Sequence, residues 1–274
     1  MNSSFIIQPQ GINTEHADLY LEIKPGGVAY IILDNNTCIA LATYHFPLDA
    51  SDAMVVESIH GLIKDQPVLQ ERFKNVYIIY GYPQSVLVPN ELMNGQDNET
   101  MLNLVFGDVG EGVIRSEYMP RHQIHNVYRV PAQVDAVVSR YFEQAAFTHL
   151  FSLLPDVIKS TGTHLYCIFD PGQLTAMLLK NGKLQLVQNY DYKTPDDVAY
   201  QLLNICERFD VDLPGVTVHL SGMIDGASAL YTELNKYFLQ VFFEGLREEY
   251  EYPENFQQYP AHYFSHLFAL VSCV

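Results

Sequence analysis

The chain contains the same three-strand pattern twice, and this repeat limits its possible folds more than any other feature of the sequence. Residues 18–44 and 164–190 each show apolar runs separated by tight-turn residues, including a Pro-Gly pair, and they align without a gap. Seven aligned pairs are identical: Leu19/Leu165, Tyr20/Tyr166, Pro25/Pro171, Gly26/Gly172, Leu33/Leu179, Asn35/Asn181 and Tyr44/Tyr190. Each segment therefore predicts an antiparallel meander of three strands.

The same two elements follow each meander. In the first copy, helix-start residues at 49–52 precede apolar positions spaced for one helical face, and residues 75–83 form a short apolar run. In the second copy, Thr194 and Pro195 are typical of a helix N-cap and first turn, and residues 215–223 read as a buried strand that ends in Gly. The order β-β-β-α-β is thus predicted twice.

A strand, helix, strand connection requires parallel pairing, so each copy predicts a mixed sheet with a crossover helix. Two such sheets predict two domains with a cleft between them. We expect a first domain over residues 12–158, a linker near 158–164 and a second domain over 162–255. Residues 256–272 predict an amphipathic helix that packs back on the first domain.

Charge and cysteine usage exclude several classes of protein. The 15 Lys and Arg residues against 32 Asp and Glu residues give a net charge of -17, which repels a nucleic-acid backbone. No apolar run is long enough to span a membrane, and the N-terminus lacks a signal-peptide pattern. Scattered Cys38, Cys167, Cys206 and Cys273 favour reduced, packed thiols. These features predict a cytoplasmic protein that binds no nucleic acid and does not insert into membranes.

The repeated element order resembles the superfamily of actin, the heat-shock chaperone ATPases and the sugar kinases. More narrowly, residues 85–92, 128–142 and 262–273 resemble an uncharacterised bacterial family of unknown function with an actin-like ATPase fold, and residues 127–154 are similar in layout to cytoplasmic actin-like proteins of pilus and secretion assemblies. The resemblance implies an α/β fold of two duplicated, ribonuclease H-like β-β-β-α-β-α domains.

In that superfamily a nucleotide lies between the domains, and a turn of the form Asp-x-Gly approaches its phosphates in each domain. The glycine admits close approach of backbone amides, and the carboxylate orients magnesium-bound water. In the second domain Asp170, Gly172 and Gln173 keep this pattern. If the protein is an active enzyme, the resemblance makes Asp170 the metal-orienting carboxylate; no other catalytic residue is assigned.

The first-domain turn keeps Gly26 and Gly27 but has Lys24 where the family pattern has Asp. At about 4 Å and an effective dielectric of about 20, one unit charge is worth roughly 4 kcal/mol, so this reversal disfavours a magnesium ion. Lys24 could instead contact phosphate, or its chain could extend to solvent at the hairpin end.

The superfamily's adenosine turn corresponds to Ser221 and Gly222, but Met223 replaces its second glycine and occupies space that a nucleotide would use. Each Pro-Gly pair is also an ordinary turn, with no ligand implied. His262 and His266 lack the glutamate of a metalloprotease motif, and we interpret them as packed or surface histidines rather than metal ligands.

Three functions remain open from the sequence. The preferred hypothesis is a scaffold or protein-interaction module with degenerate nucleotide motifs and one or more protein partners. The alternative is an active hydrolase or kinase that binds magnesium-ATP, with Asp170 and Lys24 at its phosphates. The third is an actin-like polymer subunit. The sequence does not identify the partner, the substrate or the oligomeric state.

Overall fold

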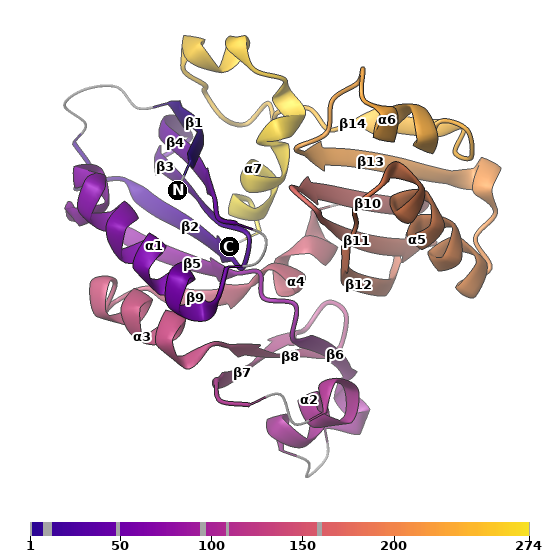
Figure 1. Cartoon of the computed structure of the whole chain (residues 1–274), viewed down its shortest axis with the longest axis horizontal. Helices are drawn as coiled ribbons and strands as arrows, with labels where there is room; N and C mark the ends of the chain where they lie inside the picture. The colour runs from indigo at the N-terminus through magenta and orange to yellow at the C-terminus, as the bar shows by residue number, and fades with distance from the viewer. Residues whose placement is uncertain are drawn as a thin grey trace. The chain divides into compact units, whose positions relative to one another are not determined.

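The computed structural model describes residues 2–7, 13–47, 50–93, 97–107, 110–157 and 161–273, with backbone only for residues 2–4 (Figure 1). Contacts divide the chain into a first unit of Met1–Ser152 with Glu249–Glu254, and a second unit of Leu153–Glu248 with Asn255–Val274. Residues 158–160 of the expected linker and the expected helix-start position Asp49 lie outside the described residues. The domain boundaries given above stay a prediction.

The first unit is built on a six-stranded sheet in the order β1-β4-β3-β2-β5-β9. The neighbouring pairs β2/β5 and β5/β9 are parallel, and β2, β3 and β4 form the expected antiparallel meander. The strands are β1 (Asn2–Ile7), β2 (Asp18–Lys24), β3 (Gly27–Asp34), β4 (Thr37–His45), β5 (Asn75–Tyr80) and β9 (Ala146–His149). The helices of this unit's main layer are α1 (Asp52–Asp65), η1 (Pro67–Gln70) and α3 (Ala132–Tyr141).

The second unit is built on a five-stranded sheet in the order β12-β11-β10-β13-β14. Its strands are β10 (Thr163–Asp170), β11 (Gln173–Lys180), β12 (Lys183–Asp191), β13 (Val216–Gly222) and β14 (Gln240–Phe243). Its helices are η3 (Leu154–Asp156), α5 (Pro195–Arg208), η4 (Leu213–Gly215) and α6 (Ala229–Leu234). Helix α4 (Leu150–Leu153) lies where the chain passes from one unit to the next.

Strands β4-β3-β2-β5-β9 and β12-β11-β10-β13-β14 have the same order, so the two units share one topology. In both, the first strand of the meander pairs in parallel with the strand after the helix. This arrangement is the predicted α/β fold with ribonuclease H-like units.

The crossover helices begin where their capping residues predict. The Ser51 side chain accepts a hydrogen bond from the Met54 amide at the start of α1. At the start of α5, Thr194 and Asp197 form a reciprocal capping box, with Pro195 in the first turn. Each cap satisfies amide groups that a helix leaves without partners, and it therefore fixes the first turn of the helix.

Each sheet packs one face against its crossover helix. In the first unit, Leu21 and Ile23 of β2 belong to a core that includes Ile59 of α1 and Val134 of α3. In the second unit, Leu165, Cys167 and Phe169 of β10 share a core with Val198 and Leu202 of α5. The alternation of side chains along a strand puts the even-numbered residues of β2 and β10 on the other face of each sheet.

A three-stranded sheet with the order β6-β8-β7 is inserted in the first unit between β5 and α3, and it was not expected. The inserted segment contains the strands β6 (Ser85–Pro89), β7 (Val113–Met119) and β8 (Ile124–Val130) and the helices η2 (Asn90–Leu92) and α2 (Asn98–Phe106). Its small core joins Val88, Leu102 and Val127. Strand β7 has no fully buried residue before Met119, so it lacks the apolar run by which buried strands are recognised.

The C-terminal segment differs from the expected single helix over residues 256–272. It contains two short turns, η5 (Glu254–Gln258) and η6 (Ala261–Tyr263), and a helix α7 limited to Ser265–Val271. Pro260 interrupts the segment because proline disfavours a helical conformation in the residue before it. Every residue of α7 is buried, so the helix is not amphipathic in this setting. Residues 255–274 group with the second unit rather than the first.

Among the described residues, no helix combines the length and the apolar character needed to cross a bilayer. All four cysteines are free thiols, with Cys38, Cys167 and Cys206 buried and Cys273 partly exposed. Burial raises the pKa of Cys38 to about 12 and that of Cys206 to about 11, which keeps both thiols protonated and unreactive.

Gly27 allows close approach of β3 to β4, whereas its neighbour Gly26 does not face a crowded site. A Cβ added at Gly27 would lie 2.3 Å from the Tyr44 carbonyl oxygen, but one added at Gly26 would meet nothing within 4 Å. We expect Gly27→Ala to lower the free energy of unfolding by more than about 2 kcal/mol, since the strands must separate. Gly26→Ala, the matched control, should change it by less than about 1 kcal/mol. Urea titration of both variants measures this; equal effects would show that the close approach is not required.

Candidate functional site

The expected nucleotide-contact residues lie at the carboxyl ends of parallel strands. Lys24 ends β2, and the turn after Asp170 ends β10. Ser221 and Gly222 end β13, whose in-register partners on β10 are Ile168 and Phe169. Within the second unit the structure thus places the Asp170 turn and the Ser221–Gly222 pair on neighbouring strands at one sheet edge. This edge is the usual ligand position in open α/β sheets.

Lys24 does not extend to solvent. The residue is 6% exposed, and its Nζ lies 3.2 Å from Oε2 of Glu22, which is also buried and precedes it by two residues on the same face of β2. The expectation that its chain reaches water is therefore wrong. The aliphatic part of Lys24 instead packs against Gly81, where an added Cβ would lie 2.5 Å from Lys24 Cγ. Lys24 has an internal counter-ion in this structure.

The two Pro-Gly turns differ in backbone conformation. In the second unit Gly172 has a φ of 70°, the left-handed value that favours glycine, while Gly26 in the first unit has no positive φ. The second turn is further braced by Tyr192, whose amide donates to the Gly172 carbonyl and whose hydroxyl donates to the Asp170 carbonyl. These hydrogen bonds within the protein are enough to account for the conformation of the turn, without a ligand.

Side chains next to the second turn also have protein partners. Gln173 Nε2 donates to Asp191 Oδ1 over 3.4 Å, across the β11–β12 pair. Gln173 is therefore directed along the sheet to a neighbouring strand. The carboxylate of Asp170 is half-buried at the end of β10.

Ser221 is fully buried beneath the C-terminal segment. Its hydroxyl lies 3.0 Å from the His262 carbonyl oxygen, 2.7 Å from Ser265 Oγ and 3.2 Å from His266 Nδ1, and it accepts the His266 amide at 3.1 Å. One hydroxyl has one donor and two acceptor positions. The hydrogen-bonding capacity of Ser221 is therefore used within the protein.

His262 holds the same segment from its other side. Its Nε2 donates to the Ile224 carbonyl oxygen at 2.7 Å, and its ring lies 4.2 Å from that of Phe243. Burial lowers the pKa of His262, although the Ile224 hydrogen bond acts in the opposite direction. The interpretation of His262 and His266 as packed histidines agrees with their burial. The described residues contain no cluster of three or more potential metal-ligating side chains.

Gly222 completes this strand end with a φ of 81°, and a Cβ there would lie 2.3 Å from the Phe169 carbonyl oxygen. The next residue, Met223, donates its amide to the same carbonyl. Glycine is thus required by the approach of β13 to β10, with or without a ligand.

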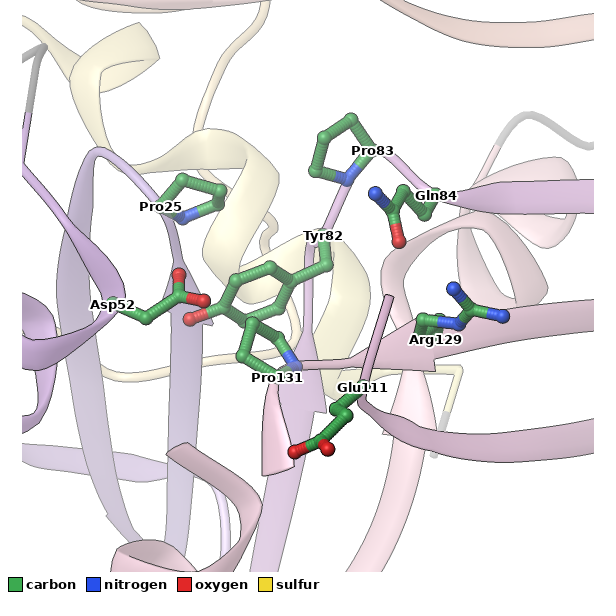
Figure 2. Close-up of a pocket in the computed structure, with 8 residues that line it drawn as sticks. All are labelled: Pro25, Asp52, Tyr82, Pro83, Gln84, Glu111, Arg129 and Pro131. Atoms are coloured by element: carbon green, nitrogen blue, oxygen red, sulfur yellow. The ribbon is translucent and has the colours of Figure 1, made fainter. Parts of the chain in front are cut away.

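A separate pocket of about 220 Å³ lies in the first unit and was missed by the sequence analysis (Figure 2). It opens beyond the carboxyl ends of β2 and β5, where the inserted sheet joins the main one. Its walls are Pro25, Asp52, Tyr82, Pro83, Gln84, Glu111, Arg129 and Pro131. Three prolines that follow strands were the available sequence signal, but proline at a strand end is also common where nothing binds.

Tyr82 is the aromatic residue among the eight that line this pocket, and it is 5% exposed. Among the described residues its hydroxyl has no hydrogen-bond partner, an arrangement that typically costs about 1–3 kcal/mol. Burial raises its pKa, and the nearby Asp52 carboxylate adds to the effect. Figure 2 shows the Asp52 carboxylate and the Tyr82 hydroxyl turned toward the same side of the pocket.

Arg129 contributes a buried guanidinium whose hydrogen bonds are mainly directed away from this pair. Its Nη1 donates to the Gly110 carbonyl oxygen at 2.9 Å, and its Nη2 lies 3.5 Å from Asn103 Oδ1. Figure 2 shows the guanidinium pointing away from Asp52. Glu111 is an exposed carboxylate on the remaining side.

The family model for a protein of unknown function, DUF3822, matches residues 9–241. The chain belongs to the DUF3822 family. A solved structure from Bacteroides thetaiotaomicron VPI-5482, a protein with actin-like ATPase fold and unknown function, is similar with a TM-score of 0.79 and 17% sequence identity, over 95% of this chain and 97% of that one.

A chain of the PilM-PilN type IV pilus biogenesis complex is similar to this DUF3822 protein with a TM-score of 0.62 and 13% identity, over 94% of this chain and 98% of that one. At such identities the likeness shows the fold alone. It confirms the actin-like ATPase fold expected from the sequence, and the DUF3822 match confirms the expected family resemblance. Comparison with curated proteins gave no match.

The buried Glu22–Lys24 pair leads to a prediction about the stability of the protein. Lys24→Met removes the counter-ion of a buried carboxylate, and we expect the free energy of unfolding to fall by about 3–5 kcal/mol. Glu22→Gln combined with Lys24→Met should recover most of this loss, because both charges of the pair are then removed. Lys183→Met at an exposed position of β12 is the control. Urea unfolding measures these changes. If Lys24→Met left the free energy of unfolding unchanged, the pairing with Glu22 would be contradicted.

The burial of His149 leads us to expect that the stability of the protein depends on pH. It is fully buried between the Tyr82 carbonyl oxygen and the Phe151 amide, and burial lowers its pKa to about 3. The unfolded chain binds the proton near pH 6.5, so the neutral folded form is fully favoured above that pH and loses stability as pH falls toward about 3. The slope reaches at most about 1.4 kcal/mol per pH unit.

His149→Gln should reduce this slope between pH 6.5 and 5, whatever it does to stability at pH 7. Denaturant unfolding at several pH values measures it. An unchanged slope would show that other buried histidines account for the acid sensitivity.

Proposed function

We propose that this DUF3822 protein is a cytoplasmic protein-interaction module that uses the actin-like fold as a scaffold and does not hydrolyse ATP. The observation that carries the proposal is the position of Ser221. Its hydroxyl is saturated by His262, Ser265 and His266, and the segment that carries these residues covers the end of β13.

The residues at the first-unit turn support the same proposal. Lys24 replaces a carboxylate and is neutralised by Glu22, so it offers neither a ligand for magnesium nor a free positive charge for a phosphate. Together with the occupied Ser221, these residues do not fit a magnesium-bound triphosphate. The proposal therefore includes no step through a nucleotide.

A protein partner is supported by the similarity in fold to a chain of the PilM-PilN type IV pilus biogenesis complex. The net charge of -17 favours a partner that presents basic groups over one that presents phosphates. The Tyr82 pocket, which the first unit forms by itself, offers a binding surface of a suitable kind.

A nucleotide titration tests the proposal. We expect 5 mM magnesium-ATP to leave the melting temperature unchanged within about 1 °C. A ligand at 100 times its dissociation constant would add about 2.7 kcal/mol, which is several degrees for a chain of this length.

A saturable shift at sub-millimolar ATP that Asp170→Asn abolishes would overturn the proposal and favour the hydrolase or kinase alternative, because the Asp170 turn keeps its family pattern. Glu207→Gln, which changes an exposed carboxylate in the last turn of α5, is the matched control. Phosphate release by the wild-type protein would count against the proposal in the same way.

A further inference from the structure

The Tyr82 pocket has the position and the charge of a binding site that the nucleotide motifs do not include. It lies beyond the carboxyl ends of β2 and β5, where the loops of an α/β sheet usually hold ligands. All eight of its lining residues belong to the first unit. The described part of the first unit is therefore enough to form it.

Its size suits a group smaller than a nucleotide. The pocket of about 220 Å³ is below the roughly 300–1,000 Å³ typical of small-molecule sites, so it fits the end of one long side chain. Pro25, Pro83 and Pro131 form an apolar rim against which an aliphatic stem can pack.

Its charge favours a cation. Asp52 and Glu111 supply two carboxylates, while the one positive lining residue, Arg129, is directed to the Gly110 carbonyl oxygen. A phosphate would meet both carboxylates and would be repelled. A guanidinium or ammonium group would be attracted by both.

The buried Tyr82 hydroxyl is a second, independent indication of a ligand. It is a polar group more than nine-tenths buried, and no described residue satisfies it. Its oxygen is closed to solvent, and Figure 2 shows it turned toward Asp52, another lining residue of the pocket. Buried polar groups in native proteins are nearly always paired, so an unpaired one next to a pocket marks a place for an outside partner.

We propose that this pocket receives an arginine side chain of the protein partner, with the guanidinium between Asp52 and Glu111 and close to the Tyr82 hydroxyl. Arginine is favoured over lysine because its planar group donates to two acceptors at once. The inference rests on the proposed function, because it assumes a protein partner, and it names the chemistry that the partner must present.

The test uses the full chain and a capped amino acid, Nα-acetyl-arginine N-methylamide, followed by amide NMR. We expect saturable shifts centred on Tyr82 and Gln84 with a millimolar dissociation constant, and binding at least fivefold weaker at 300 mM than at 50 mM salt. The citrulline analogue, which has the same shape without the charge, should produce no saturable shift.

Asp52→Asn and Glu111→Gln should each weaken binding of the arginine probe at least fivefold, and Tyr82→Phe should weaken it at least twofold. Asp65→Asn, at the exposed opposite end of α1, is the matched control and should leave binding unchanged. The inference is overturned if the probe gives only shifts scattered over the surface, if citrulline binds equally, or if Asp52→Asn binds as the wild type does.

These outcomes are separate from those of the nucleotide titration. ATP binding would overturn the proposed function and leave the arginine result as measured. If the arginine probe did not bind, the proposed arginine site would be wrong, but the absence of ATP binding would still support the proposed function.

Discussion

In both units the strand that opens the meander pairs in parallel with the strand that follows the crossover helix, and most of the molecule depends on this pairing. Parallel pairing needs a long right-handed connection, which α1 and α5 supply. It also brings two strand ends to one edge, so that the β10 turn lies beside Ser221 and the β2 turn beside Tyr82. The places where a ligand could act are therefore set by the sheet before any particular side chain is chosen.

At those edges the protein has satisfied its polar groups internally in several ways. Lys24 lies against Glu22, Gln173 donates to Asp191, and the Ser221 hydroxyl is bonded to the C-terminal segment. Each contact stabilises the fold, and each would have to be broken before the same group could bind a phosphate. Breaking a buried ion pair or a buried hydrogen bond is costly. The group that stays buried has then lost both its partner and its contact with water. The fold is thus compatible with binding a ligand at these edges, but the internal contacts of these residues disfavour binding a phosphate.

The Tyr82 pocket shows the opposite arrangement. Its hydroxyl has no internal partner among the described residues, and carboxylates outnumber free cations around it. The inserted sheet supplies Glu111 and Arg129, while the main layer supplies Asp52 and Tyr82. A pocket has therefore formed where two sheets of one unit meet, and its lining carboxylates have the same sign as the net charge of the chain.

The sequence by itself determined the two meanders, the crossover helices with their Ser51 and Thr194 caps, and the parallel strands after them, because period, caps and turn residues act over a few neighbouring positions. It did not show the inserted sheet, whose strand β7 is too weakly buried to give an apolar pattern. Only the tertiary structure decided that Lys24 is paired, that the C-terminal segment covers Ser221, and that Asp52, Tyr82 and Glu111 share a pocket. Ser221 and His266 are 45 positions apart. The Glu22–Lys24 pair is local, but its formation depends on burial, which no local pattern of residues encodes.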